Sequence, residues 1–504
     1  MLLRAFVLLL VTLIASLPLL LMDGWRGTEG RRVQIALEMI EHGNWMVPTI
    51  GFEPTWAKPP LHYWQLCGIL QWFGDDLWLL RMPSVIGLFA MALLAMILLR
   101  RWFGEAAGWV GALGVVCSPV IAFEWATAEI DPVFAAFTAM SLWCLATGVA
   151  RDRRRLVVAA GVLGGLAMLQ KGPPYLVFAA GAWLVWWRRR GFRYAVTYFV
   201  PLLGLPLCYF VPLWLWWVEP AEMMSEVQGE TVGRLAAFTL GRVLETPLFW
   251  LRAAFVQFPF VLWCFWEWRG ERDARMDPGD LTLRMCSGAA VLAVVLLSFF
   301  PGRPTRYLLP NIPLFMFAVA PAVAHFASQE RMLGTFSQRI LRVIGIAGSV
   351  GLVAVPFFVD RFGIAAAGAL ACAGLAWLLV KTPRQLVIYS LLLPIVVAWT
   401  VGIERSTTWS GHPRAVEPLA GLLRRELSAL DIADVATFGH VDGKLLLGAG
   451  LLPKGDEFCR SQPTAKWLLS TEGGVIGDGP EGYAERLWLT SPVGLFKLHE
   501  RLPR

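Results

Sequence analysis

The stretch from Ile130 to Arg155, IDPVFAAFTAMSLWCLATGVARDRRR, contains the pattern that decides the fold. Its first part, as far as Ala150, is almost wholly apolar and has the length of about 20 residues that an α-helix needs to cross a hydrocarbon core about 30 Å thick. Arginines then dominate the five residues that follow. The pattern predicts a membrane-spanning helix that ends in a basic loop.

Apolar segments of this length recur along the whole chain. With 57% apolar residues, 16% charged residues and a mean hydropathy of +0.58, the 504 residues cannot be arranged around one soluble core. The composition therefore predicts a polytopic membrane protein. About 13 spans are expected from their length, at residues 3–22, 82–99, 106–125, 130–150, 155–170, 173–187, 195–218, 247–268, 283–301, 306–327, 340–359, 363–380 and 386–403.

Basic residues predict which side of the membrane each loop faces, because Lys and Arg favour cytoplasmic loops. If the N-terminus is cytoplasmic, residues 23–80 and the chain beyond 404 lie on the far side, which in a bacterial inner membrane is the periplasm. The net charge of +7 then reflects sidedness rather than a nucleic-acid partner. Each predicted cytoplasmic loop is basic, and these loops contain Arg100 and Arg101, Arg151 to Arg155, Arg188 to Arg193, Arg269 to Arg284, Arg331 to Arg342, and Lys381 to Arg384.

The eight cysteines indicate neither a disulfide framework nor a metal cluster. No C-x-x-C pair occurs, and most of the cysteines lie in apolar runs, where they behave as small hydrophobic residues. We expect no cofactor, and the sequence leaves the question of a divalent metal open. The apolar run from Ala5 to Met22 lacks a clear A-x-A cleavage site, so we interpret it as a retained first span.

Cations on the predicted far side are unexpected, because Lys and Arg favour cytoplasmic loops, so each of them requires a structural or functional explanation. Arg81 opens a span and Arg361 stands beside Asp360, so we interpret both as interfacial anchors. The full set is Arg26, Arg31, Arg32, Lys58, Arg81, Lys171, Arg234, Arg242, Arg303, Arg306 and Arg361.

The first far-side loop begins with an amphipathic helix pattern. Thr28 can cap this helix and Gly43 can end it. Its start brings Glu29, Arg31 and Arg32 to the positive end of the helix macrodipole, where guanidinium and backbone N–H groups favour a phosphate. A capped surface helix with exchangeable charges is the alternative. The expected apolar positions are Val33, Ala36, Leu37 and Ile40.

A second amphipathic pattern, from His62 to Phe73, follows the turn Lys58-Pro59-Pro60. Lys58 would then lie close to lipid phosphates. A snorkelling lysine is the alternative, although an anchor has no need of the fixed backbone direction that the two prolines impose. The aromatic residues expected at headgroup level are Tyr63, Trp64, Trp72 and Phe73.

Ionisable residues also stand at the far-side ends of later spans. Asp131 and Lys171 are costly at such depths, and residues of this kind usually face a cavity. Asp131 followed by Pro132 is equally typical of a helix cap, so catalysis and capping both remain open.

The turn from Pro301 to Pro310 carries two guanidinium groups, Arg303 and Arg306, beside Tyr307. This arrangement suits an anion. The charges of residues 219–246 fit a solvated helix with ordinary i,i+4 pairs.

Taken together, these motifs resemble the polyprenyl-phosphate-sugar-dependent glycosyltransferases of GT-C type, the family of the lipid A aminoarabinose transferases and their protein O-mannosyltransferase-like relatives. The resemblance extends from the first span to the thirteenth. Its most specific parts are Glu29-Gly30-Arg31-Arg32, Glu38-Met39, Gly43 to Pro48, Lys58 to Trp64, and Arg81 to Ser84, followed by Glu129-Ile130-Asp131, Lys171-Gly172-Pro173 and Arg306 to Pro310.

The resemblance implies an all-α transmembrane domain over residues 1–403, with amphipathic periplasmic helices in the loop 23–80. It also implies that one sugar passes from a polyprenyl (undecaprenyl) phosphate carrier to a periplasmic acceptor such as lipid A, lipopolysaccharide core or protein, with inversion at the sugar carbon. Cations would stabilise the leaving phosphate, and a carboxylate would orient or deprotonate the acceptor hydroxyl. The implied residues are Arg31, Lys58, Lys171, Arg303, Arg306 and Tyr307 for the donor phosphate, Glu29 and Asp131 for catalysis, and His62, Tyr63 and Glu129 for positioning the acceptor or the loop.

The chain departs from the family pattern at two acidic positions. Family members usually open the first loop with an Asp-Glu pair, where this chain has Thr28-Glu29. A glutamate commonly precedes the loop lysine, where this chain has Ala57. The usual position of the acidic catalyst is therefore non-ionisable, and Glu29 and Asp131 remain competing candidates.

Residues 404–504 are less apolar and predict a small α/β domain outside the membrane. A helical pattern occurs near 417–430, and strand-like runs occur at 435–439, 467–470 and 487–490. In position and size the domain resembles the periplasmic appendage of the aminoarabinose transferases. We interpret it as a lid or an acceptor platform.

A transporter of a lipid-linked sugar or another anion is the alternative function, because far-side cations around a cavity would also serve binding. Transporters often have inverted repeats and a site near the midplane of the bilayer. The sequence shows no clear repeat, and its unexplained charges lie on one side. A structural or sensory scaffold is a third possibility.

Overall fold

The computed structural model describes the chain in segments. They are residues 1–21, 28–50, 53–118, 121, 125–216, 246, 249–250, 253, 280–299, 305–328, 382, 384–385, 387–388, 436–438, 467–471, 483–491 and 494–501. The chain divides into two compact units, which we describe one at a time. The first comprises Met1–Met22, Ala57–Leu61 and Arg81–Thr407, and the second comprises Asp23–Trp56, His62–Leu80 and Thr408–Arg504.

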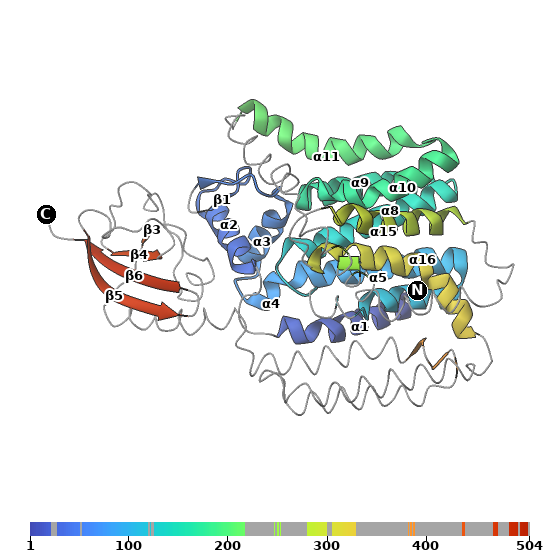
Figure 1. Cartoon of the computed structure of the whole chain (residues 1–504), viewed down its shortest axis with the longest axis horizontal. Helices are drawn as coiled ribbons and strands as arrows, with labels where there is room; N and C mark the ends of the chain where they lie inside the picture. The colour runs from blue at the N-terminus through green and yellow to red at the C-terminus, as the bar shows by residue number, and fades with distance from the viewer. Residues whose placement is uncertain are drawn as a thin grey trace. The chain divides into compact units, whose positions relative to one another are not determined.

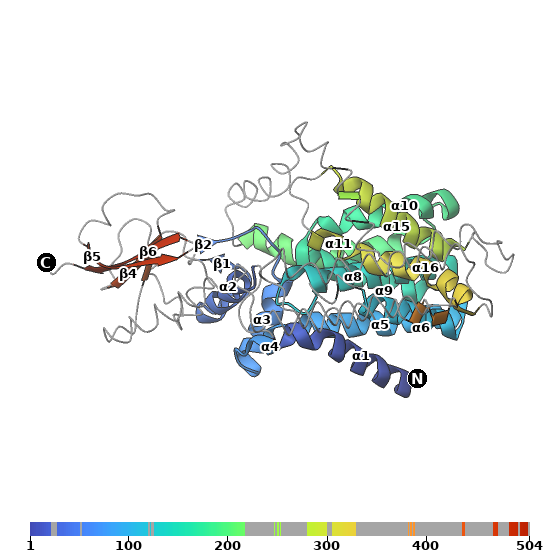
Figure 2. The ribbon, with the colours of Figure 1, turned by 60° about the horizontal axis from the view of Figure 1, so that its bottom comes forward.

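Apolar helices make up most of the described part of the first unit, where they lie side by side (Figures 1 and 2). By length and composition, α1, α5, α8, α11 and α16 could each cross a membrane. The helices are α1 (Leu2–Leu20), α5 (Met82–Phe103), α6 (Glu105–Val116), α8 (Ile130–Ala150), α9 (Arg154–Lys171), α10 (Pro174–Arg190), α11 (Ala195–Trp216), α15 (Leu281–Leu297) and α16 (Asn311–Ser328), with the 3-10 helix η1 (Thr305–Leu308) before α16.

The predicted spans that fall on these residues are helical. The span predicted at 130–150 coincides with α8. The span predicted at 106–125 is too long, because α6 ends at Val116. The span predicted at 306–327 starts too early, because η1 precedes α16. The spans predicted at 247–268, 340–359, 363–380 and 386–403 lie outside the described residues, apart from isolated positions.

Glycines let the helices of the first unit approach closely. A Cβ atom added at Gly161 on α9 would lie 2.4 Å from the carbonyl oxygen of Tyr198 on α11. At Gly181 on α10 it would lie 1.9 Å from the carbonyl oxygen of Gly288 on α15. Such contacts matter in a bilayer, because lipid chains are as apolar as leucine and helices associate by close packing.

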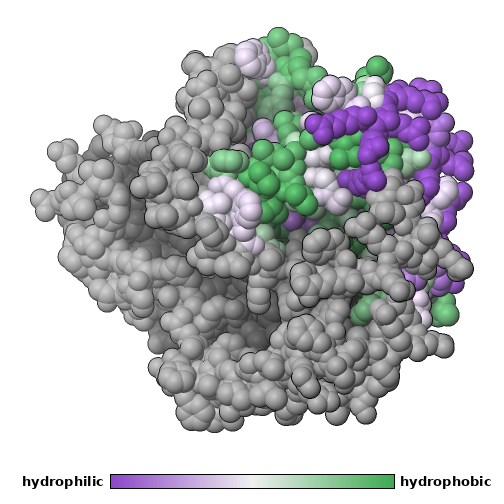
Figure 3. Space-filling model, turned by 45° about the vertical axis from the view of Figure 1, so that its right-hand side comes forward, coloured by the Kyte–Doolittle hydropathy of each residue, from purple (hydrophilic) through white to green (hydrophobic). Residues whose placement is uncertain are grey.

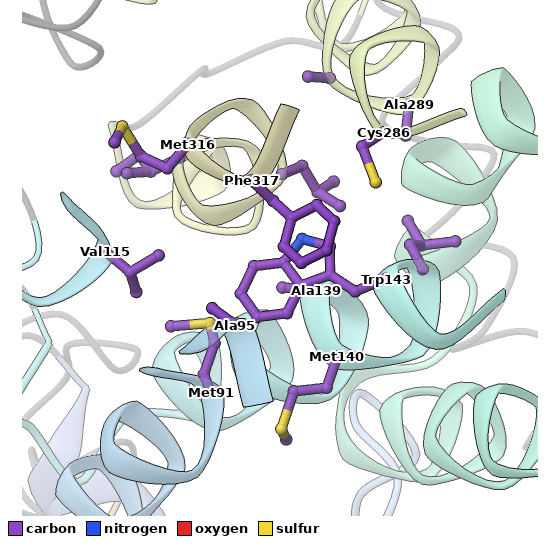
Figure 4. Packing of buried hydrophobic residues seen from close by; sticks show 14 of the residues in the cluster. Met91, Ala95, Val115, Ala139, Met140, Trp143, Cys286, Ala289, Met316 and Phe317 are labelled. Carbon is purple, nitrogen blue, oxygen red and sulfur yellow. The ribbon is translucent and has the colours of Figure 1, made fainter. Parts of the chain in front are cut away.

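Aromatic stacking forms the centre of the core. Trp143 on α8 lies against Phe317 on α16, with ring centroids 4.9 Å apart and ring planes 20° apart. Figure 4 shows this pair among side chains of α5, α6 and α15, including Met91, Val115 and Cys286. The cluster joins these helices and so determines which helix ends lie together.

One end of this helical unit is rich in arginine. The last turn of α5 carries Arg100 and Arg101, and the last turn of α10 carries Arg188 and its two neighbours. The guanidinium group of Arg151, just after α8, pairs with Asp280. Figure 3 shows hydrophilic side chains gathered on one part of this face, beside an apolar surface.

The second unit contains the helices of the first loop. They are α2 (Glu29–Glu41), α3 (Leu61–Trp72), which begins at the boundary of the first unit, and α4 (Leu77–Leu80), together with the hairpin β1 (Thr49–Ile50) and β2 (Glu53–Pro54). Thr28 is the N-cap residue of α2, as predicted, although its side chain makes no capping hydrogen bond. Gly43 follows the helix with φ +62°, a left-handed conformation that favours glycine.

A four-stranded sheet is the described part of the chain beyond residue 404. Its order is β3 (Ala436–Phe438), β4 (Trp467–Thr471), β6 (Gly494–Arg501), β5 (Tyr483–Ser491). Only β3 and β4 pair in parallel. The runs predicted at 435–439, 467–470 and 487–490 correspond to β3, β4 and part of β5, whereas β6 was not predicted because its charged residues weaken the apolar pattern. The helical pattern near 417–430 lies outside the described residues.

Candidate active site

The end of the first unit opposite the arginines carries a charged cluster centred on Asp131. Lys171, the last residue of α9, donates a hydrogen bond from Nζ to Oδ1 of Asp131 in the first turn of α8. Both side chains are only 11% exposed. Arg151 follows the other end of α8, about 30 Å away at 1.5 Å per residue, so the two charged groups lie about one hydrocarbon thickness apart.

Two aromatic rings enclose the ammonium group of Lys171. Its Nζ lies 4.7 Å from the ring centroid of Tyr307 and 5.4 Å from that of Phe134. A cation over an aromatic face is stabilised by the ring quadrupole, more strongly where water is excluded. Tyr307 was predicted from the sequence. Phe134 was missed, although its position one helical turn after Asp131 places it on the same face of α8.

Arg306 completes the cluster from η1. One of its terminal nitrogens, Nη1, lies 3.8 Å from Oε1 of Glu129, and its Nε lies 3.9 Å from Oδ2 of Asp131. Both distances exceed that of a hydrogen bond. The buried Nε has no hydrogen-bond partner among the described residues. An unsatisfied buried donor is costly, and an anionic oxygen would satisfy it.

The turn that carries Lys58 adjoins the same helix end. Pro59 packs on Gly172, where an added Cβ would lie 3.7 Å from Cγ of the proline ring. Gly172 directly follows Lys171 and has φ +88°. The ammonium group of Lys58 donates to the carbonyl oxygen of Ala57 over 2.7 Å. The chain therefore brings the turn of Lys58 to the end of α9 that holds Lys171.

The structure contradicts the anchor role expected for Arg81 and excludes the capping role considered for Asp131. Arg81 is not a snorkelling anchor, because its side chain is fully buried and donates to the carbonyl oxygen of Leu19 over 2.8 Å. This carbonyl group lies in the last turn of α1, where it also accepts a backbone N–H from the helix cap. Asp131 is not the cap of α8, because Glu129 occupies the N-cap position and Asp131 lies inside the first turn.

The predicted site residues of the first loop belong to the second unit. Glu29 is fully buried at the start of α2. Arg32 donates to the hydroxyl of Tyr63 over 3.0 Å, and His62 lies edge-on to that ring. His62 and Tyr63 are both buried. Tyr63 therefore faces neither lipid nor solvent, and its depth relative to the headgroups stays a prediction.

Trp72 and Phe73, at the end of α3, are strongly exposed, as an interfacial position requires. Nearer the start of the loop, Arg31 is partly buried, and its Nε has no hydrogen-bond partner among the described residues.

Glu38 has a structural explanation within the second unit. Its carboxylate accepts hydrogen bonds from Gln34 over 3.0 Å and from Thr49 over 2.9 Å, which joins α2 to the hairpin. Cys67 on α3 donates to the carbonyl oxygen of Ala36 over 3.3 Å. Burial raises the pKa of this thiol to about 12. Both groups join elements of the first loop to one another.

Some predicted features lie outside the described residues. These are Arg26, Arg303, Arg361 with its interpretation as an interfacial anchor, and almost all of the segment 219–246. No group of three or more His, Cys, Asp or Glu in the described segments is arranged to hold a metal ion. The Asp131 cluster itself offers two carboxylates, Asp131 and Glu129, beside the cations Lys171 and Arg306.

The chain is similar to known proteins in both sequence and fold. Residues 57–216 match the family model described as dolichyl-phosphate-mannose-protein mannosyltransferase. In structure, the chain is similar to ArnT from Cupriavidus metallidurans bound to undecaprenyl phosphate, with a TM-score of 0.66 and 18% identity over 98% of this chain and 96% of that one. The apo form of the same protein matches with a TM-score of 0.64 and 17% identity, over 96% of each chain. At this identity the likeness establishes the fold.

In sequence, the chain is similar to undecaprenyl phosphate-alpha-4-amino-4-deoxy-L-arabinose arabinosyl transferases. The relative from Pseudomonas savastanoi pv. phaseolicola is 26% identical over 360 residues, which is 67% of this chain and 64% of the relative. One from Pseudomonas fluorescens is 30% identical over 203 residues, which is 38% of this chain and 34% of the relative. The chain thus spans less than two thirds of these relatives. The resemblance to GT-C, ArnT-like glycosyltransferases is confirmed, and the transporter alternative is not favoured.

Proposed function

We propose that the protein is a bacterial inner-membrane glycosyltransferase that moves one sugar from a polyprenyl phosphate carrier to an acceptor on the periplasmic face. The observation that carries the proposal is the cluster of Asp131, Lys171, Arg306 and Glu129 at one end of the helices. The similarity to an ArnT structure bound to undecaprenyl phosphate supports the choice of donor. Lipid A, another glycan and a protein are the acceptor classes that we propose.

The topology of the proposal follows from the two ends of the bundle. The arginine-rich end faces the cytoplasm under the positive-inside rule, which directs the Asp131 cluster and the region after residue 404 to the periplasm. About 13 spans then place the N-terminus in the cytoplasm. A cluster on this side can take its donor directly from the outer leaflet of the inner membrane.

The cations of the cluster act on the leaving group. A sugar leaves a phosphodiester carrier as its anomeric carbon–oxygen bond breaks, and the phosphate gains negative charge in the transition state. Lys171 and Arg306 meet this charge, with Lys58 reaching from the adjoining turn and Tyr307 holding the ammonium of Lys171 in place. Arg31 and Arg303 are further donor-binding candidates in the first loop and beside η1.

Asp131 is the first candidate for the acidic role. In the described geometry its carboxylate is the counter-ion of Lys171 and lies close to Arg306. A phosphate that binds these cations takes over that pairing, so the carboxylate becomes available to orient the acceptor hydroxyl and accept its proton. Glu29 is the competing candidate, with Glu129, His62 and Tyr63 as positioning residues.

The test is sugar transfer by purified protein in detergent, with a labelled sugar on undecaprenyl phosphate and extracted acceptor lipids or glycans. We expect Lys171→Met and Arg306→Gln each to lower turnover by about 100-fold or more, because removing one preorganised electrostatic donor typically has that effect. Arg188→Gln, at the other end of the unit, is the matched control and should keep full activity. Activity in detergent requires no sealed compartment and therefore excludes obligatory transport. Normal turnover in both cluster variants would refute the proposal.

A further inference from the structure

A second charged site lies at the arginine-rich end of the first unit, away from the Asp131 cluster. A pocket of about 500 Å³ is formed there by Met1, Ile97, Arg100, Arg101 and Glu105. These residues belong to the start of α1, the end of α5 and the start of α6. The 22 residues of α5 extend over about 33 Å, so the pocket takes no part in the proposed reaction.

The pocket has an excess of positive charge. Glu105 accepts hydrogen bonds from Nε of Arg4 over 2.6 Å and from Nε of Arg100 over 2.5 Å. Trp109 donates to the same carboxylate over 3.1 Å. Arg101 lies over the ring of Trp102 at 5.3 Å and has no ion pair among the described residues. Arg100 and Arg101 line the pocket with one carboxylate, and Arg4 bonds to that carboxylate from beside the pocket, so three guanidinium groups stand against one negative charge.

The carboxylate of Glu105 orients two of these guanidinium groups. Each bond through Nε fixes the plane of an arginine fork, and a fixed fork binds phosphate oxygens with little further loss of side-chain freedom. The stacking of Arg101 on Trp102 restricts the third group in a similar way. The three groups are therefore held in place at a helix end that carries other exposed arginines.

The surface beside the guanidinium groups is apolar. Leu2, Leu3 and Phe6 on α1 are exposed, and Ile97 inside the pocket is also exposed. A soluble anion would contact only the guanidinium groups and leave this surface unused. An acyl chain would cover it, because chains of this kind surround a membrane helix at this depth.

We propose that this pocket binds the headgroup phosphate of an anionic phospholipid from the leaflet that the arginine-rich end faces. The lipid phosphate contacts Arg100 and Arg101, and its acyl chains lie along Ile97 and the exposed face of α1. The partner is a membrane lipid with net negative charge, such as phosphatidylglycerol or cardiolipin, and it is distinct from the sugar donor. The binding does not depend on the proposed transfer reaction.

The experiment uses the full chain in nanodiscs of phosphatidylcholine with a small fraction of phosphatidylglycerol or cardiolipin, and native mass spectrometry measures the anionic lipid retained. We expect the unchanged protein to retain the anionic lipid preferentially. Arg101→Gln should weaken the affinity for this lipid by about five-fold, and Arg100→Gln/Arg101→Gln by about thirty-fold, because each substitution removes roughly one arginine contact with the lipid phosphate. The matched control is Arg188→Gln/Arg189→Gln, an exposed pair on the last turn of α10, which should retain the lipid as the unchanged protein does.

Three outcomes would overturn the proposal. The first is equal retention by Arg101→Gln, which removes no ion pair and should leave the fold intact. The second is an equal loss in the control pair, which would indicate a general attraction to the whole basic end. The third is displacement of the lipid by millimolar inorganic phosphate or glycerol phosphate, which would assign the pocket to a soluble anion. Sugar transfer in the same nanodiscs is measured separately, so its failure would bear on the proposed function alone.

Discussion

Neutralising Asp131 tests two proposed roles of its carboxylate separately. One is competition with the carrier phosphate for Lys171 and Arg306, and the other is deprotonation of the acceptor hydroxyl. The Asp131→Asn substitution keeps the shape of the side chain and removes one negative charge next to Lys171 and 3.9 Å from Nε of Arg306. If the carboxylate competes with the carrier phosphate for these cations, the variant should bind the carrier more tightly. If it also takes the acceptor proton, the same variant should turn over slowly.

The structure sets the size of both effects. Two unit charges 4 Å apart interact by about 1 kcal/mol in water and by about 4 kcal/mol at an effective dielectric constant near 20. Asp131 is largely buried, whereas the side chain of Arg306 is 39% exposed, so solvent screening reduces the gain. We expect about 1–2 kcal/mol, or a 5- to 30-fold fall in the Kd for undecaprenyl phosphate. Loss of a general base should lower kcat by about 100-fold or more.

Tryptophan fluorescence or calorimetry with undecaprenyl phosphate measures the Kd without turnover, and the transfer assay supplies kcat. Asp152→Asn is the control, because it removes one exposed carboxylate from the arginine-rich end of the same unit. A Kd that stays the same or rises in Asp131→Asn would refute the idea that the carboxylate competes with phosphate. An unchanged kcat would remove Asp131 from the acid–base role and direct attention to Glu29→Gln.

Three further predictions concern packing and ionisation. Gly181→Leu should separate α10 from α15 and lower the melting temperature in detergent, because even a Cβ would lie 1.9 Å from the carbonyl oxygen of Gly288. Gly204→Leu is the control, since no atom lies within 4 Å of a Cβ added there. Equal melting temperatures of the two variants would contradict the observed packing. Cys67, whose pKa burial raises to about 12, should resist maleimide at pH 8 in the folded protein and react after denaturation, and rapid labelling of the folded protein would show that the thiol is accessible. The hydrogen bond from Arg4, followed by that from Arg100, lowers the pKa of Glu105. The stabilising contribution of this pairing is therefore present above the ordinary carboxylate pKa and is lost as the pH falls through the lowered value. Between pH 7 and pH 3 the melting temperature of Glu105→Gln should fall less than that of the unchanged protein, and identical pH profiles would exclude a contribution from the pairing.

Sequence patterns predicted individual helices well and their partners poorly. The bounds of α8 were predicted from apolar length alone, and Gly43 marked the end of α2 correctly. Arg81 was misinterpreted because a cation at a span end usually reaches water, whereas here its guanidinium group donates to the carbonyl oxygen of Leu19 inside the protein. The burial of Tyr63 was not predicted because its partner Arg32 lies on another helix. Errors of this kind concern contacts between segments that are distant along the chain.

The amino-acid sequence by itself determined the membrane class, the alternation of basic helix ends and the choice of residues with no evident topological role, because hydropathy and charge are properties of short segments. Only the tertiary structure decided that Asp131 meets Lys171, 40 positions away, and that Arg306 approaches both Asp131 and Glu129. Close approach at glycines such as Gly181 and the stacking of Trp143 on Phe317 select which helices are neighbours. These packing contacts depend on the shapes of two surfaces at once, and no single segment specifies both.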